Sequence, residues 1–132
     1  MQKILLIHSD SAIRHKLTFL LQHSGFQVAD ASAPGPPLVE IDRSPPDLVV
    51  MAEGSRKFNG DKLCVRIREI CQAPIIILGQ DQEEAAGIDF LKMGADVYLT
   101  FPLDARELLA YVHSLLRRRQ MQQSVKRDSK EQ

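Results

Sequence analysis

A few side chains near the ends of apolar runs could do chemistry. His8 and Asp10 follow the run at residues 4–7, and Glu53 follows a second run at residues 47–52. His8 could titrate near neutral pH or carry a phosphoryl group, although a packed structural histidine is the simpler interpretation. Asp10 could hold a cation, but a single carboxylate binds Mg²⁺ weakly. We therefore expect Asp10 to be the N-cap of a helix.

The two cysteines, Cys64 and Cys71, are the other candidates for chemistry. They lie seven residues apart on one face of a predicted helix. Without a second Cys or His pair they make a poor zinc site, and buried structural thiols are favoured. The sequence contains no nucleophile–base pair and no metal-ligand cluster, so we predict that the chain is not an enzyme.

Apolar runs alternate with helical periods along the chain, which indicates five βα units. Strands are expected at residues 4–7, 26–31, 47–52, 74–78 and 97–99. Helices are expected after Asp10, as a short element at residues 38–43, around Leu63, Ile67 and Ile70, at residues 82–93, and after Asp104. The predicted fold is α/β: a (βα)5 flavodoxin-like, doubly wound parallel sheet of order 2-1-3-4-5. Ligands of such sheets bind at the carboxyl ends of the strands.

Length and charge limit the remaining classes of protein to which the chain could belong. The 132 residues suit one core, and the equal counts of 17 basic and 17 acidic residues favour neither nucleic acid nor membrane. No apolar run reaches the roughly 20 residues of a membrane span, and the first apolar run is too short for a signal peptide. We expect a cytoplasmic protein. Residues 1–119 should form the domain, and residues 120–132 a polar, basic tail or linker.

Three stretches resemble the receiver domain of bacterial two-component response regulators. They are residues 46–51, residues 59–69, and residues 94–103 with the sequence GADVYLTFPL. Residues 106–109 and 115–118 resemble the last helix of the subgroup that carries a DNA-binding output domain. The resemblance covers about residues 3–119. It implies a signalling module, with DNA contacted through an output domain outside this chain.

The resemblance also implies where phosphoryl-transfer chemistry should lie. The family uses an acidic pair for Mg²⁺, a phosphoaccepting aspartate, a hydroxyl and a lysine. These positions fall on His8 and Ser9, Ala52, Gly79, and Phe101. A methyl group cannot be a nucleophile, and five changes together are hard to compensate. We expect a degenerate, phosphorylation-independent pseudo-receiver that has lost Mg²⁺ binding.

Two alternatives remain open. A displaced phosphoacceptor could be Glu53 or Asp10, although strand alternation should turn Glu53 away from the site. A small ligand could instead occupy the crevice at the strand ends. Each alternative places function at the strand ends rather than on the surface.

The last strand carries the predicted switch and partner surface. Tyr98 matches the aromatic that receivers reorient, and we hypothesise that it holds one orientation while Phe101 packs over Ala52 and Gly79. The bond before Pro102 should be cis, as is usual at this position in the family. A protein partner, or a second copy, is expected on the face formed by helix four, strand five and helix five. Its predicted residues are Val97, Tyr98, Glu107 and Tyr111.

Overall fold

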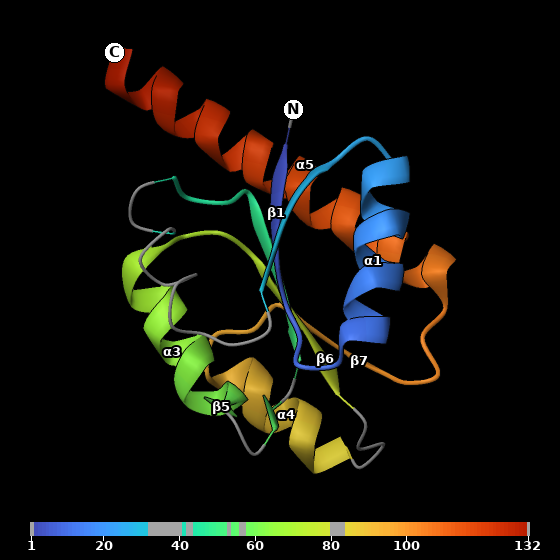
Figure 1. The fold of residues 1–132 in the computed structure, drawn as a ribbon. Coiled ribbons are helices and arrows are strands. Elements are labelled where there is room, and N and C mark those ends of the chain that lie inside the picture. The colour runs from blue at the N-terminus through green and yellow to red at the C-terminus, as the bar shows by residue number, and fades with distance from the viewer. Residues whose placement is uncertain are drawn as a thin grey trace.

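The computed structural model describes residues 2–31, 41, 44–52, 54–55, 58–79 and 84–131. Its main sheet has five parallel strands in the order β2-β1-β3-β6-β7, which confirms the predicted topology (Figure 1). The strands are β1 (Lys3–Ile7), β2 (Gln27–Ala31), β3 (Leu48–Ala52), β6 (Ile75–Gly79) and β7 (Val97–Thr100). Each lies within two residues of its predicted range.

Helices cover both faces of the sheet. They are α1 (Ser11–His23), α3 (Gly60–Ile70), α4 (Glu84–Lys92) and α5 (Ala105–Glu131). Figure 1 shows α1 and α5 on one face, with α3 and α4 on the other. The predicted helix at residues 38–43 lies outside the described part of the chain, apart from Ile41, which is buried.

Strand alternation divides the core into two clusters. Along β1, Leu5 and Ile7 face α3 and α4, whereas Ile4 and Leu6 face α1 and α5. The strands are nearly all apolar because both faces of the sheet are covered. Cys64 and Cys71 are buried in the cluster under α3, as predicted for structural thiols.

Local sequence signals set the ends of the helices. Asp10 caps α1, and its Oδ1 accepts hydrogen bonds from the N–H groups of Ala12 at 2.9 Å and Ile13 at 3.1 Å. Asp104 caps α5 in the same way. Gly94 follows α4 with φ +110°, a conformation that a residue with a Cβ rarely adopts.

Three features differ from the sequence predictions. The expected loop after β3 contains β4 (Gly54–Ser55) and β5 (Phe58–Asn59), which pair antiparallel. Ile70 is 44% exposed, because the buried stripe of this segment runs through Cys64, Ile67 and Cys71. The last helix does not end near Leu116 but continues to Glu131, since no Gly or Pro interrupts residues 105–132.

No helix in the described part of the chain is long and apolar enough to cross a membrane.

Candidate functional site at the strand ends

The parallel register brings the predicted site positions together at the carboxyl ends of the strands. Ile7 is paired with Met51, Ala52 with Leu78, and Gly79 with Thr100. His8 and Phe101 follow directly after β1 and β7. The backbone N–H of Phe101 donates to the carbonyl of Gly79 at 3.1 Å, which continues the pairing past the strand end. The backbone therefore gathers these positions as the sequence analysis expects.

His8 is a packed residue and is only 6% exposed. Its Nδ1 accepts a hydrogen bond from the N–H of Asp10 at 3.1 Å, so the neutral ring carries its proton on Nε2. Its carbonyl accepts from the Arg14 guanidinium at 2.9 Å. Burial lowers the pKa of His8, with Asp10 opposing this effect and Arg14 adding to it. These contacts describe a neutral histidine that holds the β1–α1 loop.

Ser9 and Asp10 complete that loop, and both are exposed. Ser9 offers a hydroxyl where the acidic pair of a receiver would place its second carboxylate. The described part of the chain contains no group of three His, Cys, Asp or Glu residues able to hold a metal ion. Asp10 is the one carboxylate of this loop, and its Oδ1 is already engaged by the first turn of α1.

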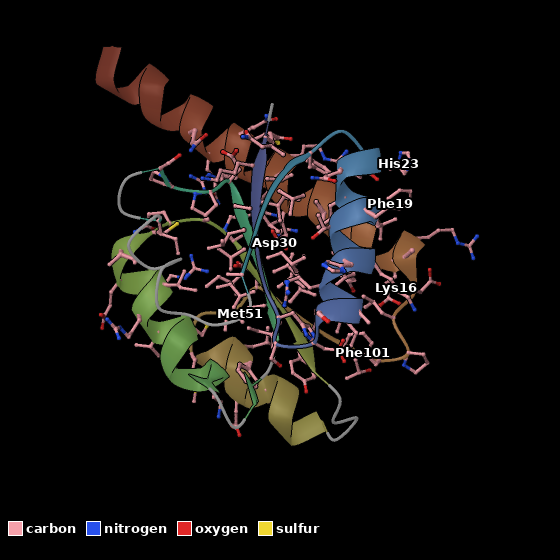
Figure 2. All side chains as sticks on the ribbon, viewed as in Figure 1. Lys16, Phe19, His23, Asp30, Met51 and Phe101 are labelled. Carbon is pink, nitrogen blue, oxygen red and sulfur yellow. The ribbon has the colours of Figure 1, made fainter. Side chains whose placement is uncertain are left out.

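The Phe101 ring packs toward α1. It is partly buried against the cluster between the sheet and α1/α5, and its ring meets the His8 ring edge-on at a centroid distance of 6.3 Å. Figure 2 shows Phe101 beyond the end of β7, close to the start of α1. The Ala52 side chain and Glu53 lie outside the described part, so the expected packing of Phe101 over Ala52 stays a prediction. The bond between Phe101 and Pro102 is cis.

The predicted partner residues divide between the two faces at β7, which is an edge strand. Tyr98 packs on the α3/α4 side and stacks with Phe90 at 5.7 Å, whereas Val97 packs on the α1/α5 side. Both are half-buried, so they contribute less surface than expected. Tyr111 is 39% exposed, and Glu107 is exposed at the start of α5.

Sequence reasoning missed two exposed residues of α4. Ile88 and Leu91 are 43% and 46% exposed, and they lie three residues apart, which places them on one side of the helix. Ile88 and Leu91 lie on a different side of α4 from Phe90, an α4 residue that packs into the core, and this offset was the signal in the sequence. These residues extend the apolar surface on the helix that flanks β7.

Comparison with known families decides the identity. The family model for the response regulator receiver domain matches residues 4–113. The chain belongs to this family. The receiver assignment agrees with the order of the strands in the sheet.

Relatives of this receiver are regulators with a longer chain. It is 30% identical over 118 residues to the sensory transduction protein RegX3 of Mycobacterium tuberculosis, covering 89% of this chain and 52% of that one. It is 35% identical to the transcriptional regulatory protein AfsQ1 of Streptomyces coelicolor, with the same coverage. The receiver thus spans about half the length of the curated relatives it matches.

Solved structures agree with the fold. A two-component response regulator from Clostridium difficile superposes with a TM-score of 0.85 at 29% identity, covering 89% of this chain and 98% of that one. A receiver domain protein from Clostridium thermocellum gives a TM-score of 0.84 at 27% identity, covering 92% and 98%.

Proposed function

We propose that this receiver works without phosphorylation and acts through protein–protein contacts. The observation that carries the proposal is the state of the strand-end loop, where a buried neutral His8 stands in place of a metal-binding carboxylate. Its Nδ1 lone pair is occupied by the Asp10 N–H, so the ring helps to fix the loop.

The residues at this edge do not fit Mg²⁺. A hard cation of this size needs near-octahedral oxygen ligands, usually one or two carboxylates and several waters. His8 presents an imidazole with a bound Nδ1, and the Asp10 carboxylate caps α1. Without an acidic pair, a transferring phosphoryl group lacks the bound Mg²⁺ that would offset its negative charge.

The remaining positions lack the groups that would accept and hold the phosphoryl group. Ala52 has no nucleophile, Gly79 has no hydroxyl, and Phe101 replaces a cation with a ring that packs beside α1. Tyr98 is stacked on Phe90, and Gly79 has no hydroxyl that could draw it toward a phosphoryl group. These features support a switch that is held in one state.

Acetyl phosphate with Mg²⁺ tests this proposal by intact-protein mass spectrometry. The matched control is a variant that restores the family residues: His8→Asp, Ser9→Asp, Ala52→Asp, Gly79→Thr and Phe101→Lys. The native chain should gain no phosphoryl group, and the folded control variant should gain one. A phosphoryl adduct on native Glu53 or Asp10 would contradict the proposal and favour the displaced-acceptor alternative.

The proposed partner surface lies over α4, β7 and α5. Tyr111, Ile88 and Leu91 supply its exposed apolar area, and Glu107 supplies a charge. Exposed apolar groups gathered in one region mark docking surfaces more often than scattered ones do. In this proposal the receiver is the N-terminal module of a transcriptional regulator; the relative AfsQ1, about twice its length, is a transcriptional regulatory protein.

Charge substitution tests the surface by sedimentation velocity. Leu91→Glu with Tyr111→Glu should weaken self-association or binding of the output region by about thirtyfold or more, because two buried apolar side chains contribute on the order of 1–2 kcal/mol each. Val65→Glu with Ile70→Glu, on exposed positions of α3, is the control. Equal behaviour of both double variants would reject this surface but leave phosphorylation independence standing.

A further inference from the structure

A groove that the proposed function does not use lies between α1 and the β7–α5 loop. Its volume is about 510 Å³, and it is lined by Ile13, Lys16, Leu17, Leu20, Phe101, Pro102, Leu103 and Ala105. Figure 2 shows Lys16 on α1 and Phe101 beyond the end of β7, on the same side of the molecule. Phe101, which stands at the position of the family's lysine, thus forms part of the groove wall.

The lining is suited to an apolar ligand. Ile13, Leu20, Phe101 and Leu103 pack against the core yet stay partly exposed. The volume is within the range of roughly 300–1,000 Å³ that is typical of small-molecule sites. Water in such a groove gains few hydrogen bonds from the walls, so its release by an apolar group is favourable.

The rim adds one positive charge. Among the described residues, Lys16 is the charged residue that lines the groove, and it forms no ion pair within that part of the chain. Arg14, the other strong cation of α1, is paired with Asp30 at 3.4 Å. Residues 11–23 include no Asp or Glu, so the α1 wall of the groove carries a net positive charge.

The helix also sets the length of the ligand. Ile13 and Leu20 lie seven residues apart, which corresponds to about 10 Å along a helix that rises 1.5 Å per residue. We propose that this groove binds a small amphipathic carboxylate, with an apolar body up to about 10 Å long along the Ile13–Leu20 wall and its carboxylate within reach of the Lys16 side chain at the rim. This proposal is independent of the proposed function.

Calorimetric titration with octanoate, and with 1-octanol as its neutral counterpart, tests the site. Ala105→Trp fills the groove from an exposed position without removing a core residue, and Ala110→Trp is its control on the outer side of α5. Lys16→Met removes the rim charge, and Lys92→Met on α4 is its control. Melting curves check that each variant is folded.

Octanoate should bind saturably to the native chain and to Ala110→Trp, but not to Ala105→Trp. Lys16→Met should weaken octanoate about threefold to tenfold, as expected for an ion pair that is partly exposed, and leave octanol unchanged. Absence of saturable binding, or binding that survives Ala105→Trp, would overturn the proposal. So would a self-association that Ala105→Trp abolishes while octanoate fails to bind, because a second copy would then occupy the groove.

Discussion

Replacement of Asp10 separates the capping role from a metal-binding role. In the structure its Oδ1 accepts from two N–H groups, at 2.9 Å and 3.1 Å. Asp10→Ala leaves both donors to water, and an N-cap of this kind is worth about 1 kcal/mol. The exposure of Asp10 keeps the loss near that value, because water replaces part of the cap. For a domain of this size the melting temperature should fall by about 3–5 °C.

Asp10→Asn is the informative partner of that variant. An asparagine caps as well as an aspartate but lacks the charge that a hard cation needs, so stability should change by only a few tenths of a kcal/mol. Differential scanning calorimetry with Mg²⁺ or with EDTA completes the assay, and Asp89→Ala, an exposed site on α4, is the control. A Mg²⁺-dependent rise in melting temperature that both Asp10 variants lose would refute the capping account.

Three further predictions concern the β1–α1 loop, the amino-terminal ends of β6 and β7, and the end of α5. Because burial lowers the pKa of His8 in the folded state, the unfolded chain binds more protons at mildly acidic pH. The free energy of unfolding should rise with pH up to about 6.5 and then level off, and His8→Asn should flatten this rise in urea titrations. Arg68 donates to the carbonyls of Ala73 at 2.7 Å and Gly94 at 2.9 Å, and it pairs with Asp96 at 3.1 Å. Arg68→Ala should cost about 1–3 kcal/mol, and Arg68→Lys should recover little of it in the same titrations, because an ammonium lacks the fork geometry. Deletion of residues 120–132 should leave the melting temperature within about 2 °C, because the side chains at 120–123 are exposed, and a larger fall would place the domain boundary later.

The fold was predictable because each of its signals is local. The apolar runs at β1, β3 and β6 could only be strands covered on both faces, and Asp10, Asp104 and Gly94 mark helix ends by their own backbone chemistry. The sheet order was predicted from the flavodoxin-like version of this architecture.

The orientation of side chains beyond the elements was harder to predict. Alternation assigns a face to a residue within a strand, but Phe101 lies after the end of β7, where that rule no longer applies. The Phe101 ring packs on the cluster beside α1 and lines the groove there.

Helix phase and helix length were also uncertain. Ile67 belongs to both possible apolar stripes of this segment, the predicted one that ends at Ile70 and one that ends at Cys71. The structure buries the stripe through Cys71 and leaves Ile70 exposed. The polar sequence after Leu116 resembles a tail, yet its residues are good helix formers, and nothing in their side chains ends α5. Such polar helices are recognised by the absence of breakers rather than by an apolar stripe.

Titration with beryllofluoride and Mg²⁺, followed by backbone amide resonances, tests phosphorylation independence most directly. This phosphoryl mimic needs the acidic pair, the acceptor aspartate and the lysine together. The account predicts that the amides of His8, Gly79 and Phe101 do not move in the native chain, whereas the five-residue restored variant shows a saturable shift. A saturable shift of these amides in the native chain would contradict the account.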